Sequence, residues 1–554
     1  MNAAPAPRPV IDDGRRALRL EALGVALVVF AAYTIGRPDP VATLGRLYDD
    51  SVYLSLGKSI AEGTGYRSVH LVGAPVHVKF PPLLPAVYAT AWGAFGTLDA
   101  VVTTALWLNI LITSAAAGLL WWLARRELEV GLVPAALLCI TPLLTARTMF
   151  YFSGAMGEPW LLLGWTAALL LVRHLERLRR AGASGVGTAL GLGATLAAVM
   201  LARTQGVAVT VGIIGAMLFA RMGRRAVATT VTACVAPLLV WNVWHASMVR
   251  RGPVSSLPDQ TSYLTWIPLD NVSELGHFFS RVVQMTAGEY WRTAPIILIG
   301  WESPKTALLA ATLYGLAALG VVLLARRFSA LTGSVVGTGA LLLVWPYAED
   351  RFLAPVLPVL GLAAAYAVHR VLARVSVIAR RVALAGAVLL MVAILGLNVR
   401  TRRDALRGEA TSPFVMALAQ MTRWVSANTA PTDNIMTPWG GVIYLRTGRR
   451  TSIGNPEEAA FAPSVLADPE RFYASRLLAD SVDIVVIWDG APGRAAATLR
   501  TMGASCAGLL TETDQSSPGA TAVHFYRVRR DLPCLTQHLE QRPVATPAQN
   551  KNAP

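Results

Sequence analysis

The chain has 554 residues, of which 54% are hydrophobic and only 15% are charged, and its mean hydropathy is +0.48. Soluble proteins carry about a quarter charged residues, so this composition excludes an ordinary soluble globular protein. The formal charge is +16, from 49 Lys and Arg against 33 Asp and Glu. No basic patch with interleaved aromatic residues appears, so the excess indicates basic loops on the cytoplasmic side of a membrane and no nucleic-acid partner.

Residues 1–19 form a Pro-, Ala- and Arg-rich tail that we expect in the cytoplasm. The apolar run 20–36 has no small-residue cleavage site before Arg37, so it is predicted to be an uncleaved first span. Apolar runs long enough to cross a bilayer recur as far as residue 399, and about eleven are predicted to cross. They lie at residues 20–36, 101–123, 130–148, 158–174, 187–202, 205–222, 226–247, 305–325, 329–347, 352–373 and 382–399.

Segment 82–97 is also apolar, but it is short and begins with Pro-Leu-Leu-Pro. If it does not cross, all the arginine clusters fall on one side, which should be the cytoplasm. We therefore predict a re-entrant or juxtamembrane helix there, in a multi-pass protein of the plasma (inner) membrane with a cytoplasmic N-terminus. The clusters are Arg15 to Arg19, Arg125 and Arg126, Arg173 to Arg180, Arg221 to Arg225, Arg326 and Arg327, and Arg370 to Arg381.

This topology gives a transmembrane domain over residues 20–400 and places the loops 37–81 and 248–304 outside. Residues 401–540 are more polar and are predicted to form a small extracytoplasmic α/β domain, followed by a disordered tail at 541–554. Cys506 and Cys534 lie in this domain and can form a disulfide outside the cytoplasm. Its expected strands are 484–488 and 523–528, and its expected helices are 413–427, 468–480 and 492–502.

The first outer loop reads YDDSVYLSLGKSIAEGTGY at residues 48–66, and KFPPLLP follows at 79–85. Val52, Leu56 and Ile60 recur every four residues, which predicts a short amphipathic helix at the membrane surface. Gly63 is a natural helix stop. The acidic pair at its start either caps the helix or takes part in chemistry.

Charged residues also lie at three other places that this topology puts outside. Glu158 begins one span and Arg203 ends another, while YAEDRFLAPVLP at 347–358 carries Glu349, Asp350 and Arg351. Helix-dipole effects or snorkelling explain each residue alone. Together, four segments bring carboxylates and cations to the same membrane face, where ionisable groups are candidates for function.

Sugar transfer from a polyprenyl-phosphate carrier needs both kinds of group. A carboxylate is wanted as general base for the acceptor hydroxyl, and Lys or Arg must hold the charge of the leaving phosphate. The reaction needs no nucleotide site, and the chain has no glycine-rich nucleotide fingerprint.

Asp49, Asp50 and Tyr53, followed by Lys79-Phe-Pro-Pro, resemble the first extracytoplasmic loop of the GT-C fold glycosyltransferases. The likeness is to the superfamily of protein O-mannosyltransferases and aminoarabinose transferases, and it covers roughly residues 20 to 400. It implies a polytopic α-helical GT-C fold with juxtamembrane helices. Asp50 stands where that family usually has Glu, and Phe80 separates Lys79 from the prolines.

The resemblance also implies roles for individual residues. Asp49 takes the place of the general base, and Glu158 that of a second acidic residue that positions the acceptor or a divalent metal. Lys79 and Arg203 match basic positions that hold the donor phosphate, and Arg351 is a further candidate. We also expect substrate contacts from Asp50, Tyr53 and Asp350.

The implied reaction is hexosyl or pentosyl transfer, inverting because one displacement needs one base. The expected partners are a polyprenyl-phosphate-sugar donor, membrane lipids, and a lipid, glycan or protein of the envelope as acceptor. Two alternatives stay open. A transporter or flippase would show internal repeats, which we do not find. An envelope glycan ligase or polymerase of different fold would place arginines in a late loop, and the loop 248–304 carries four.

Overall fold

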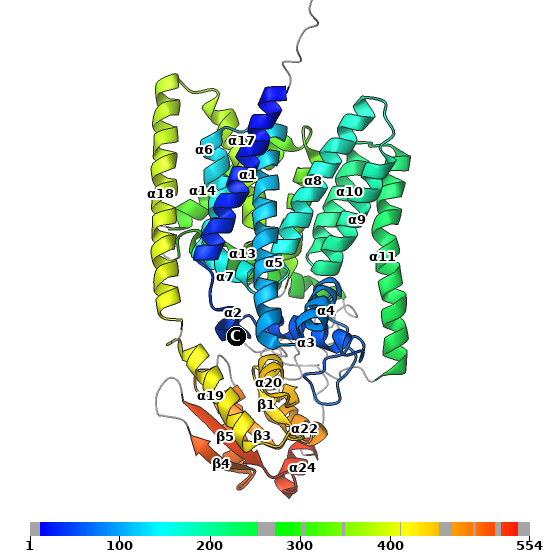
Figure 1. The fold of residues 1–554 in the computed structure, drawn as a ribbon, viewed down its shortest axis with the longest axis vertical. Helices are drawn as coiled ribbons and strands as arrows, with labels where there is room; N and C mark the ends of the chain where they lie inside the picture. The colour runs from blue at the N-terminus through cyan, green and yellow to red at the C-terminus, as the bar shows by residue number, and fades with distance from the viewer. Residues whose placement is uncertain are drawn as a thin grey trace, which may run out of the picture.

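The computed structural model describes residues 12–252, 272–300, 306–345, 349–409, 411–453, 468–490, 495–515 and 522–540. Upright helices form a bundle, short helices cover one end of it, and a small α/β domain lies beyond them (Figure 1). The predicted disordered tail at 541–554 lies outside the described residues, as do most of the N-terminal tail and part of the loop 248–304.

The bundle runs from α1 to α18, with an irregular stretch after α5. In chain order its elements are α1 (Asp12–Ile35), α5 (Leu98–Trp122), the π-turn η1 (Leu123–Glu127), α6 (Leu132–Ala135), the π-turn η2 (Ala136–Ile140), the 3₁₀ turn η3 (Thr141–Leu144), α7 (Ala146–Ser153), α8 (Glu158–Arg180), α9 (Val186–Ala202), α10 (Gly206–Phe219), α11 (Arg224–Arg251), α13 (Val272–Ile299), α14 (Thr306–Leu324), α15 (Ser329–Val344), α16 (Asp350–Leu353), α17 (Val356–Leu372) and α18 (Val377–Arg407). The α6–α7 stretch bends by 56°, and Pro142 in it interrupts regular helix hydrogen bonding.

The outside of the bundle is apolar. Leu27 on α1, Val240 on α11 and Ile378 on α18 are among many large apolar side chains that lie exposed. Soluble proteins rarely expose apolar surface on this scale, so the chain is an integral membrane protein. Five helices of the described residues are long and apolar enough to cross a membrane, or six if the bent stretch counts as one span. The predicted total of about eleven stays a prediction.

The loop predicted at 248–304 differs from the structure. Helix α11 continues to Arg251, and α13 occupies residues 272–299. The sequence of α13 mixes apolar residues at helical spacing with polar ones and includes Pro295, so it lacks the uniform apolar run that marks a span.

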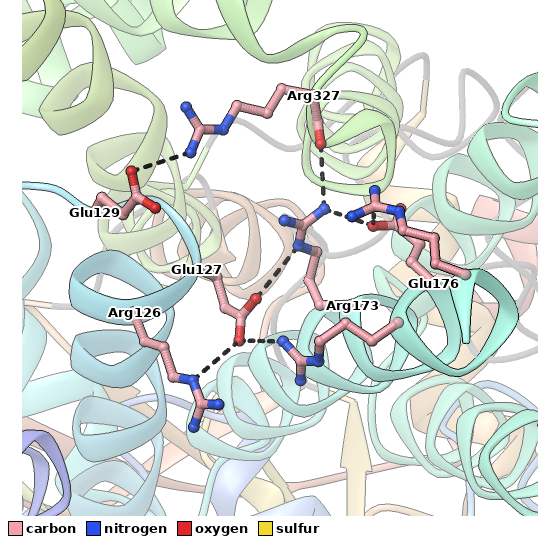
Figure 2. A network of polar contacts seen from close by, with 8 residues as sticks. Arg126, Glu127, Glu129, Arg173, Glu176 and Arg327 are labelled. Atoms are coloured by element: carbon pink, nitrogen blue, oxygen red, sulfur yellow. Dashed lines mark hydrogen bonds and ion pairs between the residues drawn. The ribbon is translucent and has the colours of Figure 1, made fainter. Parts of the chain in front are cut away.

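A network of ion pairs fastens the helices at the end of the bundle that lies away from the α/β domain (Figures 1 and 2). Glu127 of η1 is buried, and its carboxylate lies 2.6 Å from Arg177 and 3.5 Å from Arg173 of α8. Arg173 also donates to the carbonyl of Arg327, just after α14. Because Glu127 is shared among several guanidinium groups, its burial is compensated by charge.

At the opposite end, α2 (Pro40–Thr43), α3 (Asp49–Ala61) and α4 (Leu83–Phe95) lie between the bundle and the α/β domain (Figure 1). Helix α3 confirms the short helix predicted from the first loop, and Gly63, with φ +72°, follows its end. Helix α4 has 13 residues, too few to cross a bilayer, as predicted for 82–97. Gly57 lets the two helices touch, because a Cβ there would lie 3.0 Å from Tyr88.

The C-terminal domain confirms the predicted α/β class. Its sheet has the order β2-β1-β3-β5-β4, with β2, β1 and β3 parallel and the β3–β5 and β5–β4 pairs antiparallel. Cys506 and Cys534 form a disulfide with a Cα–Cα distance of 5.7 Å. Its elements are α19 (Pro413–Asn428), β1 (Ile435–Thr437), α20 (Gly440–Thr447), β2 (Thr451–Ile453), α22 (Pro469–Ala479), β3 (Ile484–Trp488), α23 (Ala495–Ser505), β4 (Leu510–Gln515), β5 (Val523–Val528) and α24 (Pro533–Glu540).

The first loop is joined to this domain. Thr451 of β2 donates its N–H to the carbonyl of His70 and accepts from the N–H of Val72, so the loop extends the sheet at its edge. Beside this bridge, α20 packs on α3 so closely that Gly441 has no room for a side chain. A Cβ there would lie 2.5 Å from the hydroxyl oxygen of Ser51.

We predict that Gly441→Ala will lower the free energy of unfolding by about 1–3 kcal/mol, the usual range for overpacking. The double variant with Ser51→Ala should lose less than the sum of the two single changes, because the clashing oxygen is gone. Thermal unfolding in detergent measures both. Gly408→Ala is the control, since the nearest atom to its Cβ would be 3.5 Å away. Equal stability of G441A and wild type would contradict the close packing.

Candidate active site

The turn before α3 fixes the position of Asp49. The Asp49 N–H donates to the Leu47 carbonyl over 2.7 Å, and Tyr48 between them has φ +58° and ψ −62°. This is a γ-turn of the rare positive-φ form, which is strained for a residue with a side chain. Such strain persists only where the surrounding structure holds it, and it is concentrated at functional sites.

Arg351 of α16 holds this turn. Its Nη1 lies 3.0 Å from Oδ2 of Asp49 and also donates to the Leu47 carbonyl at 3.2 Å. Its Nε lies 2.5 Å from Oε2 of Glu349. The side chains of Asp49 and Arg351 are only 15% and 12% exposed, so water and salt screen their attraction weakly. One guanidinium thus binds both the carboxylate and the strained turn that carries it.

Asp50 supports the turn from its buried side. Its carboxylate accepts hydrogen bonds from the N–H of Gly45 at 3.1 Å and of Ser51 at 2.6 Å. Asp50 is 3% exposed and lines neither of the two cavities that Asp49 lines, so the substrate contact expected for it stays a prediction. Burial raises the pKa of Asp50 to about 7, although the two backbone hydrogen bonds oppose this rise.

A second ion pair lies close to the first. Glu158 begins α8 and Arg203 follows α9, and Nη2 of the arginine is 2.7 Å from Oε1 of the glutamate. Both guanidinium groups pack on one ring, since Arg203 and Arg351 lie 5.3 and 5.2 Å from the centroid of Phe352. Glu158 is fully buried and lines neither cavity, so it supports Arg203. The sequence had suggested a role nearer the acceptor.

A small cavity of about 90 Å³ opens between these pairs. Lys79, Arg203 and Arg351 line it beside Asp49, and Tyr53 contributes from α3. Three cations surround one small space, and their N–H donors suit a single phosphate group. Glu158, Asp49 and Glu349 offset the charge of the two arginines.

The chain beside Lys79 is held by buried polar contacts. Nε2 of His77 accepts from the Phe80 N–H at 2.9 Å, and its Nδ1 lies 3.0 Å from the Ser68 hydroxyl. Tyr66 donates to the Phe80 carbonyl at 2.9 Å. Burial lowers the pKa of His77 well below its usual value, so the ring stays neutral and can accept this bond. His77 is therefore a structural residue that fixes the backbone from which the Lys79 side chain extends.

A larger cavity of about 600 Å³ adjoins the small one. Asp49, Glu349 and Arg351 line both cavities, so their ion pairs lie where the two spaces meet. The charged residues of the larger cavity are Arg46, Arg147, Arg351, Arg402, Asp49, Glu349 and Asp350.

The structure thus brings most of the predicted site residues together around the two cavities. Asp350 lines the larger one, where its Oδ2 lies 3.6 Å from Nε of Arg147. Sequence reasoning missed Arg46, Arg147 and Arg402, which belong to no recognised motif. Arg46 did carry a signal, because it stands three residues before Asp49 in the same loop.

The described residues of the site offer no ligand set for a metal ion. In the described part of the chain, no group of three or more His, Cys, Asp or Glu side chains is placed to hold one. Asp49, Glu349 and Asp350 each have an arginine within ion-pair distance, so guanidinium groups occupy oxygens that a hard cation would need. The divalent metal that the sequence left open therefore enters no step below.

Neither a known family model nor a curated protein sequence matches this chain. Solved structures do match. ArnT from Cupriavidus metallidurans, bound to undecaprenyl phosphate, shows 14% identity and a TM-score of 0.52, covering 93% of this chain and 98% of its own. The archaeal oligosaccharyltransferase AglB from Archaeoglobus fulgidus, in complex with an inhibitory peptide and a dolichol-phosphate, shows 14% identity and a TM-score of 0.51, covering 94% and 75%. This chain has a GT-C fold.

The match to these solved structures confirms the GT-C fold that the resemblance of the first loop implied. An identity of 14% establishes architecture and leaves the reaction to be argued from the site, because one fold serves many activities. In this GT-C protein, the residues that bear on the reaction are Asp49 and the cations around it.

We predict that Asp50→Asn will change how stability depends on pH. Asp50 has a pKa of about 7 in the folded state against an ordinary 3.8, so its contribution is present below pH 4 and is lost as the pH rises through 7. The free energy of unfolding of D50N should therefore rise relative to that of the wild type by on the order of 3 kcal/mol between pH 4.5 and 8. Unfolding in detergent across this pH range measures the difference.

The control is Asp99→Asn, which removes an exposed carboxylate at the start of α5. Its curve should run parallel to that of the wild type. If D50N also ran parallel to the wild type, the raised pKa of Asp50 would be wrong.

Proposed function

We propose that this GT-C protein is a glycosyltransferase that moves a sugar from a polyprenyl-phosphate donor to an acceptor hydroxyl, with Asp49 as general base. The observation that carries the proposal is the place of Asp49 where two cavities meet. One cavity is small and cationic, which suits the phosphate of a donor. The other is large enough for an acceptor. A base between donor and acceptor is what a direct displacement requires.

In this proposal the reaction is one displacement. The acceptor hydroxyl gives its proton to the Asp49 carboxylate as its oxygen attacks the anomeric carbon. The bond between that carbon and the phosphate oxygen breaks, and the carrier phosphate leaves with the bonding electrons. Attack opposite the leaving group inverts the anomeric centre. Arg351 fixes the orientation of the Asp49 carboxylate throughout, since it also holds the preceding turn.

Lys79 and Arg203 hold the leaving phosphate in this proposal. Charge on the phosphate grows as the glycosidic bond breaks, so cations placed beforehand stabilise the transition state more than the ground state. Glu158 acts through Arg203, because the 2.7 Å ion pair keeps that guanidinium at the cavity. Tyr53 adds an aromatic surface suited to a sugar ring or an isoprenoid unit.

Support for the donor class also comes from the fold. The matching ArnT and AglB structures contain undecaprenyl phosphate and dolichol-phosphate respectively. For this chain we propose a carrier of the same chemistry, used on the extracytoplasmic face, with a lipid, glycan or protein of the envelope as acceptor. The ligase or polymerase alternative assumed a different fold, so the GT-C fold argues against it.

We predict that Asp49→Asn will lower the transfer rate by about 100-fold or more, because the amide cannot take the proton. The variant should still fold, with a lower melting temperature, because Arg351 loses one carboxylate partner and keeps the other, Glu349. The assay uses the protein in nanodiscs, a panel of radiolabelled polyprenyl-phosphate sugars and an envelope extract. Glu62→Gln is the matched control, since Glu62 follows the same helix and lies outside both cavities.

Full transfer by D49N would remove Asp49 from the role of base. Transfer by neither D49N nor wild type, with both folded and every donor tested, would contradict the glycosyltransferase and favour the transporter.

We predict that Lys79→Gln will raise KM for the donor about tenfold or more and change KM for the acceptor much less, because it removes a charged contact to the carrier phosphate. Lys58→Gln is the matched control, since Lys58 lies on α3 against the rings of Trp92 and Tyr444 and outside both cavities. Steady-state kinetics with each substrate varied in turn measures both constants. A raised acceptor KM with an unchanged donor KM would reverse the assignment of the cavities.

A further inference from the structure

The larger cavity is lined by more arginines than carboxylates, so some of its positive charge is not neutralised by ion pairs. Arg351 is paired with Asp49 and Glu349, and Arg147 lies 3.6 Å from Asp350. Among the described residues, every carboxylate that lines the cavity is therefore engaged. Arg46 and Arg402 remain, and among the described residues neither has a carboxylate within ion-pair distance.

Arg402 is the more unusual of the two because it is buried. It is 7% exposed, and its Nε donates to the carbonyl of Gly36 at 2.6 Å. Its Nη2 is buried without any hydrogen-bond partner in the described residues. Glu409 acts on this guanidinium only from beyond ion-pair distance. A buried guanidinium that lines a cavity with an unbonded N–H and no carboxylate in contact is costly, unless a ligand supplies the missing partner.

Arg46 reaches the same cavity from the first loop. Its guanidinium lies 4.9 Å from the ring centroid of Phe150, which holds the side chain over α7. Arg46 is also close enough to Arg402 for the two positive charges to act on each other. Two like charges directed to one cavity repel, and an anion between them would turn that repulsion into attraction.

We infer that the larger cavity binds an anionic group of the acceptor, a phosphate or a carboxylate, between Arg46 and Arg402. This inference rests on the proposed function and narrows it, because it restricts the acceptor to molecules that carry a negative charge near the hydroxyl that reacts. The planar guanidinium fork suits both oxyanions, since each offers paired oxygen atoms. This anion site is distinct from the carrier-phosphate site at Lys79 and Arg203.

The test measures binding, so it does not depend on turnover. The full-length protein in phosphatidylcholine nanodiscs is titrated with glycerol 3-phosphate, with glucuronate and with undecaprenyl phosphate, each alone. Arg46→Gln is the main variant, because Arg46 is exposed and its loss should not impair folding. Arg400→Gln is the matched control, since Arg400 lies two residues before Arg402 on α18 but is 83% exposed and outside the cavity. Lys79→Gln reports on the other cavity.

Saturable binding of glycerol 3-phosphate or glucuronate to wild type is expected, and the one that binds identifies the anion as phosphate or carboxylate. R46Q should weaken that binding at least tenfold, with R400Q and K79Q within twofold of wild type. Undecaprenyl phosphate should show the reverse pattern, weakened by K79Q and not by R46Q. Arg402→Lys should bind the anion with intermediate affinity, because it keeps the charge and loses the fork.

Three results would overturn the inference. The first is that neither small anion binds the wild type. The second is that R46Q binds the small anion as well as R400Q does. The third is that R46Q weakens undecaprenyl phosphate binding as strongly as small-anion binding, which would place the carrier phosphate in the larger cavity. None of the three bears on Asp49 as base, whereas a wild type that does not bind undecaprenyl phosphate would count against the proposed function itself.

Discussion

The ion pair between Asp49 and Arg351 is the contact on which the site depends. It joins the first loop to a segment near the end of the bundle, and it lies where two cavities meet. Arg351 also accounts for the strained turn, since the same Nη1 binds the Leu47 carbonyl. Removing either partner would leave a largely buried charge, which typically costs about 3–5 kcal/mol. In the proposed reaction, the pair therefore couples the position of the base to the packing of α16 against the first loop.

The two neighbouring acids show how one short sequence supplies both chemistry and support. Asp49 points to the cavities, while Asp50 accepts hydrogen bonds from Gly45 and Ser51 inside the turn. Ser51 in turn donates to the Tyr48 carbonyl, so the strained residue is bonded on both sides. A positive-φ residue of this kind costs about 1–3 kcal/mol, and these contacts hold it. The turn keeps Asp49 in one place before any substrate arrives.

Much of this could be predicted from the sequence, because local patterns determine local structure. Val52, Leu56 and Ile60 predicted α3, and the strands predicted at 484–488 and 523–528 match β3 and β5. The sequence assigned Asp49 to the base and Asp50 to the substrate, but it could not show that Asp50 is bonded inside the turn, because the same residue type serves capping, support and chemistry. Arg46 and Arg402 were missed for a different reason. They reach the same cavity only because α18 packs beside the start of the first loop. No residue spacing in the sequence predicts that packing.

The C-terminal domain is best understood through what it touches. Its β2 edge pairs with the first loop, Gly441 of α20 lies against Ser51, and Arg446 donates to the Val41 carbonyl. Apolar side chains of α3, α4, α19, α20 and the sheet share one core, which includes Leu54, Leu84 and Phe525. These contacts all reach the first loop, and no described residue of the domain from Pro413 onward lines either cavity. Among the described residues, the domain thus supports the loop that carries Asp49, and in our proposal the arginines of the larger cavity select the acceptor.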